Sequence, residues 1–103
     1  YALSLYQNKK AKTTEENSLQ LLKEVLPLLE KETDYSNDRL YSLLQEFSAE
    51  KGYKTGFTMW PIRIALSGKQ MTPAGATEIL SVLGKEESLR RLKRAMERLE
   101  ANA

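Results

Sequence analysis

Apolar side chains recur along this chain at the spacing of an α-helix and nowhere alternate as they do in a half-buried strand. The clearest case is a run of leucines three or four residues apart: Leu19, Leu22, Leu26 and Leu29. No Asn-Gly or Asp-Gly pair joins two β-branched segments, so the strongest hairpin signal is absent. The sequence therefore predicts an all-α protein, a compact bundle of about five short helices.

Glycine and proline set the expected limits of the later helices. We expect helices to end at Gly52, Gly68 and Gly84, because glycine readily adopts the left-handed conformation that follows a last helical turn. Thr72 followed by Pro73 is the clearest start signal, an N-cap residue and then a proline at the first helical position. A helix is expected to begin at this pair and to run to about residue 83.

The limits of the first two helices are less definite. Thr13 or Thr14 can cap the first helix, and Pro27 is expected to kink or divide it, since proline lacks the N–H that a helix uses. The second helix begins at one of three polar residues: Asp34, Ser36 or Asn37. Residues 1–13 show no helical pattern. We expect them to be a tether or the remnant of a preceding domain, and residues 14–103 to form the helical domain.

Two residue types are missing altogether. The 103 residues include no His and no Cys, which excludes a disulfide, a thiolate metal site and every nucleophile that relies on histidine. No apolar run approaches the ~20 residues of a membrane span. We therefore expect a non-catalytic, cytoplasmic domain without a metal site.

Residues 51–77 have an unusual composition, with four basic side chains, three aromatic ones and no Asp or Glu. The members are Lys51, Lys54, Arg63 and Lys69, with Tyr53, Phe57 and Trp60. Cations and rings without carboxylates suit a polyanion that also presents flat bases, such as unpaired RNA. The helix start expected at Thr72 adds unpaired N–H groups, which phosphates favour. The alternative is structural: Trp60 is a core residue, and Gly75 is only a packing point.

The last helix carries six basic residues interleaved with acidic ones. Such a helix can bind phosphate or a membrane surface. However, Glu86 with Arg90 and Glu87 with Arg91 are spaced to form ion pairs along the helix. We therefore expect a solvated face whose charges pair with each other.

Three blocks of sequence, at residues 60–69, 72–79 and 83–92, closely resemble the C-terminal end of bacterial glutamyl-tRNA synthetases, class I aminoacyl-tRNA synthetases. The resemblance implies a helical anticodon-binding domain. It also implies a parent enzyme that joins glutamate to tRNA with ATP and Mg²⁺ in a separate Rossmann-type domain. The signatures of that catalytic domain are absent here, so the resemblance implies a fragment that binds tRNA and does not catalyse, with no cofactor of its own.

The resemblance also implies which residues contact RNA. Arg63 matches an anticodon-contacting arginine, and the start of the next block matches further contacts, with one upstream arginine of the family lying before residue 1. Together with the basic and aromatic window, this defines the candidate anticodon-binding residues: Trp60, Arg63, Lys69, Thr72, Pro73, Ala74, Gly75 and Ala76.

The expected partners are tRNA(Glu), with tRNA(Gln) as a second candidate, and the catalytic domain of the parent chain. We expect a monomer that does not associate with membranes. The alternative function is a helical protein–protein interaction module that docks through its basic last helix or its apolar opening segment.

Overall fold

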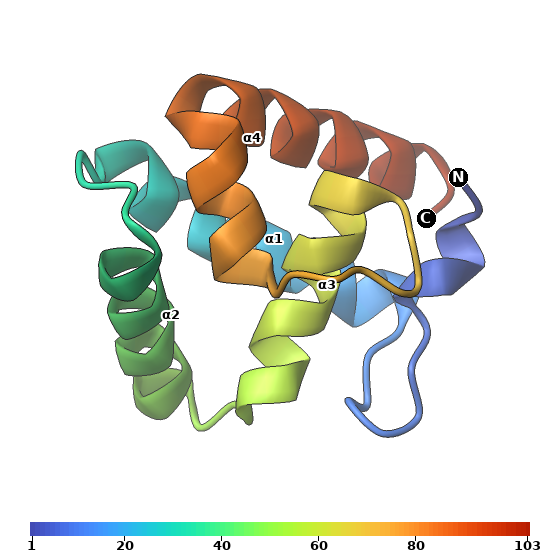
Figure 1. The fold of residues 1–103 in the computed structure, drawn as a ribbon. Coiled ribbons are helices and arrows are strands. Elements are labelled where there is room, and N and C mark those ends of the chain that lie inside the picture. Colours follow the sequence, from blue (N-terminus) through green and yellow to red (C-terminus); the bar gives the residue numbers. More distant parts are fainter.

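A computed structural model describes all 103 residues and contains one 3₁₀-helix and four α-helices, with no strand beyond a single bridge (Figure 1). The elements in chain order are η1 (Leu3–Tyr6), α1 (Glu15–Lys31), α2 (Asn37–Lys51), α3 (Thr55–Ser67) and α4 (Ala76–Ala101). The predicted all-α class is confirmed. None of the helices combines the length and apolar character that crossing a membrane requires.

The count of about five helices is reduced to four because α4 continues past Gly84. The backbone leaves the helical region at this residue (φ 81°, ψ 170°), and the helix turns sharply there (Figure 1). Glycine tolerates this positive φ without steric cost. The break expected at Gly84 is therefore present as a bend between two helical segments rather than as an end.

Most other helix ends follow local sequence signals. Thr14 caps α1 and Ser36 caps α2, each accepting a backbone N–H with its side-chain oxygen. Gly52 and Gly68 end α2 and α3 in the left-handed conformation. Pro27 lies inside α1, which is not divided there, because the loss of one hydrogen bond is outweighed by the packing of the apolar face.

The expected start of α4 at Thr72-Pro73 is wrong. The helix begins at Ala76, with Gly75 as its N-cap residue. The Thr72 hydroxyl donates to the carbonyl of Ala74 at 2.6 Å, which holds the chain in a turn before the helix. Glu78 then caps the helix, since its Oε1 accepts the N–H of Gly75 at 3.3 Å.

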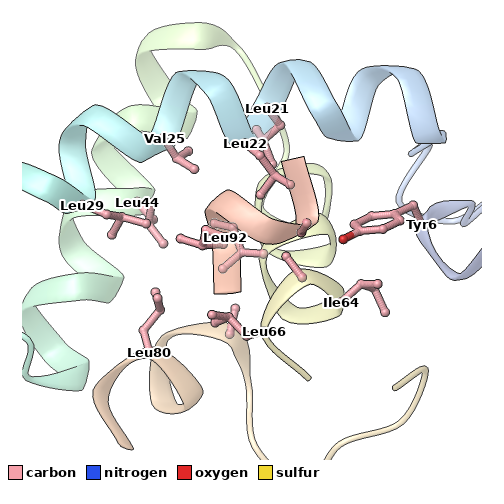
Figure 2. Packing of buried hydrophobic residues seen from close by; sticks show 14 of the residues in the cluster. Tyr6, Leu21, Leu22, Val25, Leu29, Leu44, Ile64, Leu66, Leu80 and Leu92 are labelled. Atoms are coloured by element: carbon pink, nitrogen blue, oxygen red, sulfur yellow. The ribbon is translucent and has the colours of Figure 1, made fainter. Parts of the chain in front are cut away.

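One apolar core lies between all four helices (Figure 2). Leu92 of α4 sits near its centre, with Leu22 of α1 on one side and Leu66 of α3 on the other. Leu44 brings α2 into the same core. The helices are thus held as one body, which fixes the positions of the loops between them.

The segment before α1 is packed against the helices. Tyr6 has no exposed surface and points into the core (Figure 2). Thr13 donates its hydroxyl to the carbonyl of Tyr6 at 2.7 Å, and a bridge between Asn8 and Thr13 closes the loop between them. The proposed domain division at residue 13 stays a prediction, but this segment contributes directly to the core.

Candidate nucleic-acid interface

A groove of about 900 Å³ opens between α2, α3, the start of α4 and the loop at residues 8–12. Four cationic side chains line it: Lys10, Lys12, Lys54 and Arg63. Four aromatic rings also line it: Tyr41, Tyr53, Phe57 and Trp60. Glu78 is the one acidic residue in the lining. The groove therefore combines positive charge with flat apolar surface.

Arg63 is the most constrained of these cations. Its Nη1 donates to the hydroxyl of Thr72 at 3.0 Å, and its Nη2 donates to the carbonyl of Gln70 at 2.8 Å. The guanidinium carbon lies 4.6 Å from the centre of the Trp60 ring, a cation–π contact. Arg63 is thus held on α3 against the following loop and has little freedom to reorient.

Trp60 supports this arrangement. Its indole N–H donates to the carbonyl of Leu5 at 2.9 Å, which ties α3 to the N-terminal segment. The side chain is half-buried, and Arg63 covers one part of its ring. Trp60 therefore forms a fixed part of the groove wall. The part of its ring that Arg63 does not cover is available for contact with a ligand.

The structure brings four of the eight predicted site residues to the groove wall: Trp60, Arg63, Gly75 and Ala76. Thr72 joins them through its hydrogen bond with Arg63. The other three, Lys69, Pro73 and Ala74, lie in the loop between α3 and α4 and do not line the groove. Lys69 and Pro73 are exposed, whereas Ala74 is half-buried and uses its carbonyl to accept from Thr72.

The start of α4 is fixed at the edge of the groove. Ala76 is buried, and the hydroxyl of Thr77 donates to Asn37 Oδ1 at 2.7 Å, which joins α4 to the start of α2. The Glu78 carboxylate occupies the N–H of Gly75, so one of the groups expected to be free for an anion is already used. Gly75, which has no side chain to cover its backbone, is exposed at the rim.

Sequence reasoning missed the contribution of distant segments. Lys10 and Lys12 belong to the segment expected to be a tether, yet they line the groove. Their clustering in the sequence was the available signal. Tyr41 of α2 is 47% exposed and lies outside the apolar stripe of its helix, which marks it as a surface ring. Asn37 had no signal beyond its position at a helix start.

Tyr53 and Phe57 form a paired aromatic surface within the groove, with ring centres 4.7 Å apart. The Tyr53 hydroxyl donates to Glu24 Oε1 at 2.9 Å, and this hydrogen bond raises the pKa of the phenol. The ring therefore stays neutral at physiological pH and adds no negative charge to the groove.

The fold and the groove define a small helical domain with a basic, aromatic concave face. The chain matches the sequence model of the anticodon binding domain over residues 1–96. The chain therefore belongs to the anticodon binding domain family. This match and the relatives below confirm the resemblance to glutamyl-tRNA synthetases.

Similar proteins include three glutamate–tRNA ligases. The chain is 50% identical over 102 residues to that of Lachnoclostridium phytofermentans, covering 99% of this chain and 21% of the relative. It is 43% identical over 100 residues to that of Clostridium acetobutylicum (97% and 21%) and 44% identical over 99 residues to that of Clostridium tetani (96% and 20%). The chain thus spans about a fifth of the length of the curated relatives it matches.

Proposed function

We propose that the groove binds the unpaired anticodon loop of tRNA(Glu), with tRNA(Gln) as the second candidate. The observation that carries this proposal is the placement of Arg63, which lines the groove on the face of Trp60 and is held by Thr72 and Gln70. The candidate contacts are Trp60, Arg63, Gly75 and Ala76 on the wall. Lys69, Pro73 and Ala74 belong to the adjoining loop.

Arg63 keeps the capacity to bind a nucleotide. A guanidinium has five N–H donors, and the two hydrogen bonds to Thr72 and Gln70 use two of them. The remaining three can bond a phosphate or a base edge in a forked geometry. Because the side chain is already fixed, little further entropy is lost when it binds.

The rest of the lining supports an RNA loop in particular. Unpaired bases stack on aromatic rings, and each stacked base contributes about 1–3 kcal/mol. Tyr41, Phe57 and Trp60 provide such rings along one groove, and Lys10, Lys12 and Lys54 provide charge for the backbone. A duplex keeps its bases stacked internally and would leave these rings unused.

The proposed role is binding without catalysis. We assign this domain to a longer cytoplasmic glutamate–tRNA ligase, in which a separate catalytic domain joins glutamate to tRNA with ATP and Mg²⁺. In this proposal the domain is monomeric. It belongs to the same polypeptide chain as the catalytic domain and contacts it. The identities of 43–50% with glutamate–tRNA ligases support this assignment.

The test is binding of the tRNA(Glu) anticodon stem-loop to the chain and to Arg63→Ala, measured by fluorescence anisotropy at several salt concentrations. We expect about tenfold weaker binding, a salt slope reduced by about one, and less discrimination against a stem-loop with an exchanged anticodon. Arg63→Lys should retain the salt slope but lose the discrimination, because an ammonium cannot make the forked contact.

Lys23→Ala is the matched control. Lys23 is exposed on α1, makes no ion pair and does not line the groove. If Arg63→Ala and Lys23→Ala bind the stem-loop equally well, Arg63 is not a contact and the proposed site is wrong.

A further inference from the structure

A second concave surface, of about 460 Å³, lies where the second half of α4 meets the end of α3 and the N-terminal residues. Figure 1 shows the end of α4 beside the start of the chain. Four arginines of α4 line this cleft: Arg90, Arg91, Arg94 and Arg98. No acidic residue lines it. We call it the arginine cleft.

Two of the arginines form fixed walls. Arg91 donates through Nη1 to the carbonyl of Leu66 at 2.7 Å, at the end of α3. Arg98 donates to the carbonyl of Tyr1 at 2.7 Å, and its guanidinium carbon lies 4.5 Å from the centre of the Tyr1 ring. These contacts hold two positive charges of α4 in the cleft lining, one bonded to the end of α3 and the other to Tyr1.

The other two arginines differ from each other. Arg90 donates through Nε and Nη2 to the carboxylate of Glu87. Arg94 is exposed and makes no hydrogen bond or ion pair. A free guanidinium beside fixed ones keeps its full set of donors for a ligand.

Of the two ion pairs that the sequence predicted along α4, the pair between Glu87 and Arg91 is confirmed, but Arg90 also pairs with Glu87. Glu87 accepts from both Arg90 and Arg91, and the expected pair between Glu86 and Arg90 is not formed. One negative charge is therefore shared by two arginines and cannot neutralise both. The four guanidinium groups retain an excess of positive charge that faces the cleft.

The arginine cleft and the groove share the loop between α3 and α4. Gly68, at the start of this loop, lines the cleft, and the carbonyl of Gln70, two residues later, accepts from Arg63 in the groove wall. Lys69 lies between them and is exposed. One loop therefore connects the groove wall to the arginine cleft, and it carries a further exposed positive charge at Lys69.

We propose that the arginine cleft binds a backbone phosphate of the same RNA, as a second contact that reads no sequence. This inference rests on the proposed function of the groove. Planar guanidinium groups match the oxygens of a phosphate, and phosphate contacts position an RNA without specifying bases. An acidic protein segment is the competing occupant, but the loop shared with the groove favours the RNA.

The experiment compares Arg94→Ala and the double variant Arg90→Ala/Arg94→Ala with the unmodified chain, using the anticodon stem-loop. We expect the salt slope to fall by about one for the single variant and about two for the double. The loss of affinity should be equal for stem-loops with the native and the exchanged anticodon. This distinguishes the cleft from the groove, where Arg63→Ala should change the discrimination.

Lys93→Ala is the control, because Lys93 neighbours Arg94 on α4 but pairs with Glu30 outside the cleft. Equal salt slopes for Arg94→Ala and Lys93→Ala would overturn the inference and leave the groove proposal intact. Conversely, Arg63→Ala could bind the stem-loop as the unmodified chain does while Arg94→Ala shows a reduced salt slope. That result would reject the proposed site in the groove and support RNA binding by the arginine cleft.

A peptide of ten glutamates and an oligouridylate of equal charge test the competing occupant. We expect the oligouridylate to bind more tightly and the arginine variants to reduce its binding. Tighter binding of the peptide, lost in the double variant, would overturn the RNA assignment. Failure of the unmodified chain to bind any RNA would overturn both proposals.

Discussion

Thr72 uses one hydroxyl for two contacts, accepting from Arg63 at 3.0 Å and donating to the carbonyl of Ala74 at 2.6 Å. The family resemblance implied that Thr72 contacts RNA, and the Thr72-Pro73 pattern predicted a helix cap. The geometry shows that Thr72 holds Arg63 in place, and a direct contact between Thr72 and RNA stays a prediction. Thr72 should then influence the affinity for RNA by holding the Arg63 side chain in position.

Replacing Thr72 by Val removes both hydrogen bonds and keeps the shape of the side chain. We expect stem-loop binding to weaken about fivefold, since one hydrogen bond contributes about 1 kcal/mol. The salt slope should stay the same, because the charge of Arg63 remains. Thr72→Ser keeps the hydroxyl and should bind normally in the same anisotropy assay. A reduced slope for Thr72→Val would contradict the positioning role.

At the scale of the helix, Gly52 and Gly68 perform the same local task in different surroundings. Both end a helix with positive φ, at 73° and 65°. A methyl group on Gly52 would meet nothing within 4 Å, whereas on Gly68 it would lie 2.7 Å from the Tyr1 ring. A substitution at Gly52 therefore causes backbone strain alone, whereas the same substitution at Gly68 causes backbone strain and a steric clash with Tyr1.

We expect Gly52→Ala to lower the free energy of unfolding by about 1 kcal/mol, the cost of a left-handed alanine. Gly68→Ala should cost about 1 kcal/mol more, because the Tyr1 ring must also move. Urea unfolding of both variants measures this. In a Tyr1→Ala background the two substitutions should cost the same, and a persistent difference would exclude the ring as the cause.

Along α4, Glu87 joins two arginines. Hydrogen bonds from Arg90 and then Arg91 lower the pKa of this carboxyl to about 2. A group with a lowered pKa in the folded state stabilises the protein above its unfolded pKa, and the effect is lost as pH falls toward the folded value. The stabilisation from Glu87 should therefore disappear between about pH 4.5 and pH 2.

Glu87→Gln tests this pH dependence. The variant should be less stable than the unmodified chain at pH 7, and the difference should shrink below pH 4 as the native carboxyl takes up its proton. Thermal unfolding followed across this range measures the difference. A constant difference from pH 7 to pH 2 would show that the ion pairs do not contribute.

At the scale of the whole molecule, the first thirteen residues connect to elements far away in the sequence. Tyr6 is fully buried, and Leu5 accepts the indole N–H of Trp60. Lys10 and Lys12 line the groove. The segment therefore supports both the core and the proposed RNA surface.

Tyr6→Ala should lower the free energy of unfolding by about 3–5 kcal/mol, as expected when a buried aromatic side chain is removed. Tyr41→Ala is the matched control, because Tyr41 is 47% exposed and its loss should change stability by less than about 0.5 kcal/mol. Chemical denaturation compares the two. A similar small effect for both would support the tether that the sequence predicted.

Much of the fold was predictable because it depends on neighbours in the chain. The ends of α2 at Gly52 and of α3 at Gly68, and a threonine cap before α1, follow from residues within one turn. The start of α4 was not predictable, since the Thr72 side chain is bonded to Arg63, which lies nine residues earlier on another helix. Local propensity was outweighed by a tertiary contact.

The sequence by itself determined the all-α class, most helix ends and the family. Hydrophobic periodicity, helix capping and the residues of a sequence motif are all properties of short segments. Only the tertiary structure decided that Arg63 is held by Thr72 and Gln70, that Lys10 and Lys12 line the same groove, and that the arginines of α4 share a cleft with Gly68 and Tyr1. These arrangements depend on the packing of helices from distant parts of the chain around one core. No spacing along the sequence encodes them.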